Sequence, residues 1–166
     1  MRWYSILILF ALVGCFDEEP PQWGTTQYVP VMVDRADFEA AVSVMAARDV
    51  HQAGKIYTIG NYIFLNERFK GIHVIDNTDP ANPLNKGFIN IPGNVDMAVK
   101  GNTLYADSAV DLLAIDISNP QKVVVTSRQK DTFPELIPPD MDFMPDSFRK
   151  ENREEKNTII VDWKKL

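Results

Sequence analysis

The sequence predicts a mostly β fold: two four-stranded, antiparallel, blade-like repeats of a partial β-propeller. A short N-terminal segment precedes them, and an irregular, Pro-rich, charged segment comes after them. The prediction rests first on a repeat: residues 60–64 (Gly-Asn-Tyr-Ile-Phe) return at 101–105 (Gly-Asn-Thr-Leu-Tyr), an offset of 41 from position 60 to position 101. Residues 74–80 return at 114–120, an offset of 40 from position 74 to position 114. A period near 40 with several strand-length runs per unit is typical of propeller blades.

Composition supports this prediction and excludes some functions. The 166 residues are 45% hydrophobic, enough to fill the core of one domain, and Pro (11) outnumbers Gly (8), as in turn-rich β proteins. The net charge is −6 and no basic stripe is present, so the sequence predicts no nucleic-acid partner.

The strand runs occur in a regular order. Residues 28–33 form a short extended segment, and residues 34–45 fit either a helical turn capped by Asp34 or, over 38–44, a strand. Residues 28–130 form the predicted repeat domain, with repeats at about 55–93 and 94–130. Gly-Asn, Pro-Gly and Asp-Pro turn signals separate the predicted strands, which are 55–60, 62–66, 71–76, 87–91, 95–99, 103–107, 112–117 and 123–127.

The C-terminal part breaks the pattern. Residues 131–157 are rich in proline and charge and are expected to be a linker or insertion, and residues 158–166 look like the start of a further strand. A closed propeller has about four to eight blades. The chain is therefore expected to be the N-terminal portion of a longer protein, or a short form that self-associates through open sheet edges.

The N-terminus carries a targeting signal. Arg2 precedes an uncharged apolar stretch at 3–13, which is shorter than the roughly 20 residues of a membrane-spanning helix and matches a signal-peptide core. The stretch ends in Leu-Val-Gly-Cys at 12–15, which resembles the lipobox of bacterial lipoproteins. The resemblance implies a signal peptide at 1–14, cleavage before Cys15 and lipidation (such as palmitate) of Cys15. Because two or more acyl chains anchor stably, membrane attachment is expected.

Residues 15–27 are expected to be a tether. The acidic residues Asp17, Glu18 and Glu19 resemble the surface-export signal of Bacteroidetes lipoproteins, although a solvated spacer accounts for them equally well. The expected location is the bacterial outer membrane or cell surface. Cys15 is the only cysteine, which excludes intrachain disulfides and Cys-based zinc sites.

The two repeats also resemble those of the LVIVD-repeat proteins. These have a Gly-Asn/Asp turn, a strand after it, and an apolar strand that ends in Asp with Ser-Asn/Asp-Pro. Matching elements here are residues 60–65 with 71–83, and residues 101–105 with 112–120. With the lipobox, the chain is similar to LVIVD-repeat lipoproteins of the Bacteroidetes type. The resemblance implies a β-propeller-like fold and an envelope location, and it supplies no catalytic residue.

The chain offers few candidates for chemistry. His73 aligns with Leu113 in the second repeat, which predicts a half-buried strand position, and His51 falls in a loop. Asp76, Asn77 and Asp79 fit either a calcium site or a turn; the turn is favoured because the second copy has Ser118 and Asn119. Ser108, with Asp107 and Asp111, is expected to form a turn. No catalytic residue, cofactor or metal site is predicted.

The predicted function is therefore a membrane-anchored extracytoplasmic lipoprotein that acts as a non-catalytic binding or interaction scaffold for a protein or glycan partner. Most repeat aromatics are expected in the core, with a minority free to stack on sugars or contact a protein: Tyr57, Tyr62, Phe64, Phe69, Phe88 and Tyr105. The alternative is an N-terminal fragment of an extracytoplasmic propeller enzyme acting on glycans.

Overall fold

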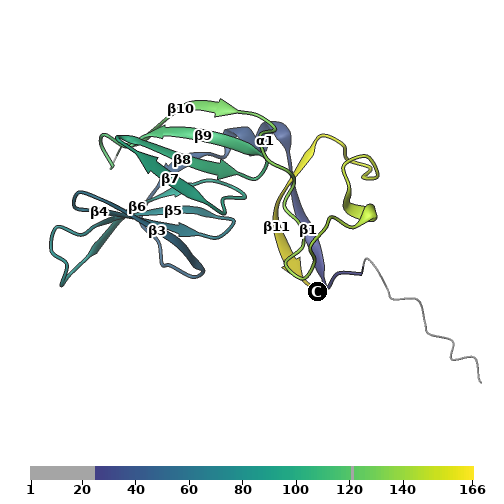
Figure 1. Ribbon diagram of the computed structural model, residues 1–166, viewed down its shortest axis with the longest axis horizontal. Coiled ribbons are helices and arrows are strands. Elements are labelled where there is room, and N and C mark those ends of the chain that lie inside the picture. Colours follow the sequence, from purple (N-terminus) through teal and green to yellow (C-terminus); the bar gives the residue numbers. More distant parts are fainter. Residues whose placement is uncertain (1–24, 121) are drawn as a thin grey trace, which may run out of the picture.

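The computed structural model describes residues 25–120 and 122–166, which form three antiparallel sheets. The first repeat sheet has the order β2(Ser43–Met45), β6(Leu84–Asn90), β5(Gly71–Asp76), β4(Tyr62–Glu67), β3(Ala53–Ile59). The second repeat sheet has the order β10(Val124–Gln129), β9(Asp111–Asp116), β8(Thr103–Ser108), β7(Met97–Lys100). The terminal sheet pairs β1(Tyr28–Asp34) with β11(Thr158–Lys165). Figure 1 shows the repeat sheets together, with α1(Arg35–Ala40) between them and the terminal sheet.

The expected repeat turns shape both sheets. Gly60 and Gly101 have φ values of +54° and +59°, which glycine adopts without the steric cost of a Cβ, and each begins the tight turn between two paired strands. At the other strand ends, Asp76 Oδ1 accepts from Thr78 N at 3.0 Å, and Asp116 Oδ1 accepts from Ser118 N at 2.8 Å. The mostly β, antiparallel, propeller-like fold with open sheets is thus confirmed.

One detail of the prediction is wrong: the first repeat sheet has five strands, not four. Strand β2 pairs with β6, with Ser43 opposite Asn90, and extends the sheet by three residues. Residues 34–45, expected to form either a helix or a strand, form a helix followed by a strand. Asp34 Oδ1 accepts from Ala36 N at 2.9 Å and caps α1, and β2 begins three residues after that helix ends.

Two apolar cores hold the sheets. The larger lies between the repeat sheets and consists of Phe64, Ile72, Val74, Ile89, Ile91, Met97, Leu104, Ala106, Leu113, Ile115 and Ile117. The smaller joins α1 and the terminal sheet to the turn between β8 and β9, through Phe38, Ala109, Val110, Ile159 and Val161. Strand β11 lies in the segment expected to start a further strand, beside the N-terminal strand β1, with Tyr28 opposite Lys165.

Residues 131–157 are irregular apart from the 3-10 helix η1(Asp146–Phe148). The segment is nevertheless attached to the rest of the protein. Trp163 Nε1 donates to Leu136 O at 3.1 Å, and Arg153 Nη1 donates to Met32 Sδ at 3.7 Å. Among the described residues, no helix is both long enough and apolar enough to span a membrane.

Candidate functional site

Cys15, the predicted lipidation site, lies outside the described residues. Thr26 Oγ1 and Gln27 N donate to the two carboxylate oxygens of Asp140 at 2.6 and 2.9 Å, and Leu166 N donates to Gln27 O at 2.9 Å. Thr26 and Gln27 are therefore attached to Asp140 and to the residue that follows β11.

The two histidines differ in environment. His51 is exposed in a loop, whereas His73 is fully buried on the face of the first repeat sheet that points away from the second. Asn85 Nδ2 lies 3.2 Å from His73 Nδ1, which makes that nitrogen the acceptor and assigns the proton to Nε2. His73 Nε2 then donates to Glu67 Oε2 at 2.8 Å.

Arg48 completes this buried cluster. Its Nη2 lies 2.8 Å from Glu67 Oε2, and its guanidinium stacks on the Phe88 ring at 4.1 Å. Burial alone raises the pKa of the Glu67 carboxyl, but hydrogen bonds from Arg48 and His73 outweigh it, so that this pKa lies below its usual value. Every member has a structural partner here: the chain after β2 passes over the outer face of the first repeat sheet and places Arg48 there.

The other candidates also have structural roles. Asp79 Oδ1 accepts from Ala81 N at 3.0 Å and so makes a turn of its own after that of Asp76. Ser108 Oγ donates to Pro92 O at 3.0 Å, which uses its only proton. Residues 25–120 and 122–166 contain no group of three or more His, Cys, Asp or Glu arranged to hold a metal ion.

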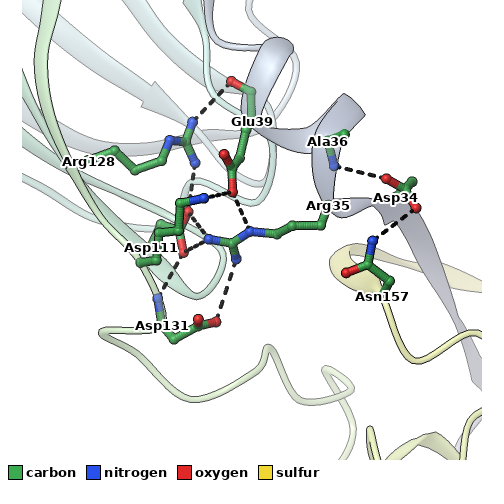
Figure 2. Close-up of polar contacts among 9 residues, drawn as sticks. Asp34, Arg35, Ala36, Glu39, Asp111, Arg128, Asp131 and Asn157 are labelled. Atoms are coloured by element: carbon green, nitrogen blue, oxygen red, sulfur yellow. Dashed lines mark hydrogen bonds and ion pairs between the residues drawn. The ribbon is translucent and has the colours of Figure 1, made fainter.

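A charged network at the start of α1 was not predicted (Figure 2). Asp111, fully buried at the start of β9, accepts from Arg35 Nη2 at 3.0 Å with each oxygen, from Arg128 Nη1 at 2.8 Å and from Asp131 N at 3.0 Å. The guanidinium carbons of Arg35 and Arg128 lie 5.6 and 5.2 Å from the centre of the buried Phe38 ring. The network fastens α1 to the second repeat sheet.

Glu39 lies at the edge of this network. It accepts from Lys130 Nζ and Arg35 Nε, each at 2.6 Å, and these two hydrogen bonds lower the pKa of its carboxyl to about 2. The residues of the network come from three segments far apart in the sequence. No local spacing connects them, so sequence patterns carried no signal for this site.

The candidate binding surface is the face of the second repeat sheet that points away from the first. Equivalent residues of the two repeats point the same way, because the second sheet stacks on the first without reversal. Phe64 faces the second sheet and is completely buried, whereas its equivalent Tyr105 is 38% exposed on what we call the free face. Leu112, the equivalent of the buried Ile72, is half-buried there.

A hollow of about 190 Å³ lies on the free face, lined by Asp96, Met97, Ala98, Tyr105, Asp107, Leu112 and Phe133. Asp107 Oδ1 accepts from Asn94 Nδ2 at 2.7 Å, Val95 N at 2.8 Å and Asp96 N at 3.0 Å. Burial nevertheless dominates, and the pKa of the Asp107 carboxyl is raised. The hollow is therefore mostly apolar, with carboxylates at one side.

Two stacked antiparallel repeat sheets of this kind define a propeller-like repeat protein. The LVIVD repeat family matches residues 52–90 and 93–129, which are the first and second repeat sheets without β2. The chain thus contains two LVIVD repeats, as the sequence predicted. No curated protein and no solved structure matches the chain.

Proposed function

We propose that this protein is a membrane-anchored extracytoplasmic lipoprotein whose LVIVD repeats form a non-catalytic scaffold for binding a partner. The free face is the observation that carries the binding role. One face of the second repeat sheet packs in the core, while the other presents Tyr105 and Phe133, 38% and 39% exposed, around a hollow. Aromatic side chains of this kind are enriched at protein interfaces.

The anchoring role is supported by the lipobox at 12–15 and by the attachment of the chain from Thr26 onward. Strand β1 is paired along its length with β11, and Arg35 holds the next element to Asp111. A lipid at Cys15 would therefore attach the membrane to a terminal sheet that is itself held to the repeat sheets. The proposed location is the outer membrane or cell surface of a bacterium.

Labelled palmitate tests the anchor. The wild-type protein, expressed in a bacterium, should incorporate label and fractionate with the envelope. Cys15→Ala should lose both properties, whereas Ser5→Ala in the same leader should keep them. An unlabelled wild-type protein, or label retained by Cys15→Ala, would contradict the proposal. Protease treatment of intact cells then separates surface exposure from an inward-facing location.

A further inference from the structure

The first repeat shows how the free face is covered when another blade stacks on it. Phe64 and Ile72 are completely buried because they share a core with Leu104 and Leu113 of the second sheet. At the polar end of the same face, Asn66 Nδ2 donates to Asn94 Oδ1 at 2.6 Å, and Asn94 belongs to the connection that leads into the second sheet. In the first repeat, this face of the sheet is thus covered by apolar side chains with a polar group beside them.

In the second repeat, the polar group equivalent to Asn66 has the opposite hydrogen-bonding role. Asp107 replaces Asn66 at the equivalent position, so a hydrogen-bond donor becomes a carboxylate that only accepts when ionised. Donors from residues 94–96 reach its Oδ1, and no ion pair reaches Asp107 from residues 25–120 or 122–166. A partner on the free face must therefore bring a donor, where the first repeat receives an acceptor.

The chemistry of the hollow favours a cation on an apolar stem. Leu112 and Ala98 offer an apolar wall, and the Tyr105 and Phe133 rings can attract a cation above their faces. A charge-assisted hydrogen bond to Asp107 is roughly twice as strong as a neutral one and would offset the unfavourable burial of its charge. Asp96, the second carboxylate on the rim, already has one cation, Lys55 at 2.6 Å.

We propose that the hollow on the free face receives a basic side chain, arginine or lysine, that projects from a protein partner. The inference rests on the proposed scaffold function and names the chemistry of its partner. The volume supports a single side chain, because about 190 Å³ is below the roughly 300–1,000 Å³ of pockets that hold small molecules. The first repeat supports a protein, since protein side chains cover the equivalent position there.

The test uses the full-length protein in detergent and a displayed library of random heptapeptides. Selection should enrich peptides with Arg or Lys beside an apolar residue. The best peptide is then synthesised and titrated, together with a copy in which Gln replaces the basic residue. We expect the Gln copy, Asp107→Asn and Tyr105→Ala each to weaken binding at least tenfold. Asp116→Asn, a charge-matched change elsewhere on the second repeat sheet, should leave binding unchanged.

Asp107→Asn keeps an oxygen for the three donors and reproduces the residue of the first repeat, so it should fold, which a dispersed amide NMR spectrum would verify. Equal binding of the basic peptide and its Gln copy would overturn the inference, as would binding that ignores Asp107→Asn and Tyr105→Ala. Binding of cellotetraose or maltotetraose at Tyr105 without basic-peptide binding would also overturn it, and would assign the face to glycans. Each of these outcomes is independent of palmitate labelling, so failure here is distinguishable from failure of the anchored scaffold.

Discussion

Lys55 and Asp96 occupy equivalent positions in the two repeats, and their side chains form a 2.6 Å ion pair between the repeat sheets. The two repeats therefore present opposite charges at one position, and these two charges pair with each other. The hydrogen bond from Lys55 also lowers the pKa of the Asp96 carboxyl. Because the two side chains are 51% and 63% exposed, the pair is expected to stabilise the protein by at most about 1 kcal/mol.

A charge exchange tests this pair. Lys55→Asp and Asp96→Lys each place like charges side by side, and each should lower the free energy of unfolding by up to about 1 kcal/mol. The double variant restores the pair and should unfold within a few tenths of a kcal/mol of wild type. Urea unfolding at low and high salt measures this. Single variants as stable as wild type at low salt would show that the pair is energetically silent.

Phe64 and Tyr105 occupy equivalent positions, but only Phe64 is covered by another repeat sheet. Their substitutions should therefore lower the free energy of unfolding by different amounts. Phe64→Ala leaves a cavity between the repeat sheets and should cost about 3–5 kcal/mol. Tyr105→Ala removes a partly exposed ring from the free face and should cost less than about 1.5 kcal/mol. Equal losses in denaturant unfolding would mean that Tyr105 is covered in solution by something other than a dissociable partner.

Substitution of the buried Asp111 should strongly destabilise the protein. Asp111→Ala leaves Arg35 and Arg128, whose side chains are 15% and 13% exposed, without their shared carboxylate, and should cost about 3–5 kcal/mol. Asp146→Ala removes a carboxylate that is 84% exposed in its pair with Arg149 and should cost less than about 1 kcal/mol. A small effect of Asp111→Ala in urea unfolding would show that the network does not hold α1 in place.

The Glu67–His73 pair should behave as a unit. Glu67→Ser and His73→Leu each introduce the second-repeat residue (Ser108 and Leu113) and leave the other partner buried, at a cost of about 1–3 kcal/mol. The double variant should cost less than the sum, because it removes both polar groups together. A strictly additive double-mutant cycle would show that the hydrogen bond contributes nothing to stability.

Glu67 also predicts a loss of stability in acid. Its pKa is lowered in the folded protein, so the stability that it contributes is present above its ordinary value of 4.5 and is lost as the pH falls below that value. Glu67→Gln should therefore show a shallower loss of stability between neutral and acidic pH. If Glu67→Gln lost stability in acid as steeply as wild type, groups other than Glu67 would be responsible for the pH dependence.

Asp107 predicts the opposite slope. Its pKa is raised, so the folded protein binds a proton more tightly than the unfolded chain, and ionisation costs stability as the pH rises from about 3.8 through the folded pKa. Asp107→Asn removes this cost and should be more stable than wild type at neutral pH, with the difference shrinking in acid. Unfolding curves at several pH values measure this. A variant less stable at neutral pH would mean that the carboxylate charge is needed to hold residues 94–96.

The repeats were predictable because their information is local. The glycine turns and the Asp-Pro strand ends recur at a constant offset, and the structure places strands at these positions. The contacts that were missed join distant segments: β2 with β6, β1 with β11, and Arg35 with Asp111, which are 76 residues apart. A carboxylate in a turn looks the same in a sequence whether it meets water or two guanidinium groups, so its burial became evident only in three dimensions.

The free face could be predicted only in part. Tyr105 was among the aromatics expected to lie mostly in the core, with a minority at a surface, and the repeat alone did not say which. Tyr105 is exposed because the described residues after β10 depart from the repeat and do not form a third repeat sheet over it. Phe133, which contributes a wall of the hollow, lies in that irregular segment and has no equivalent aromatic residue in the first repeat.

The pairing of β1 with β11 sets an order of events during synthesis. The hairpins of the repeat sheets can close as soon as their own residues have emerged, whereas Tyr28 must wait for Lys165, 165 − 28 = 137 residues later. Contacts over so long a separation are slow to form because the intervening loop must first lose entropy. Until then β1 carries unpaired backbone groups and is a site for misassociation.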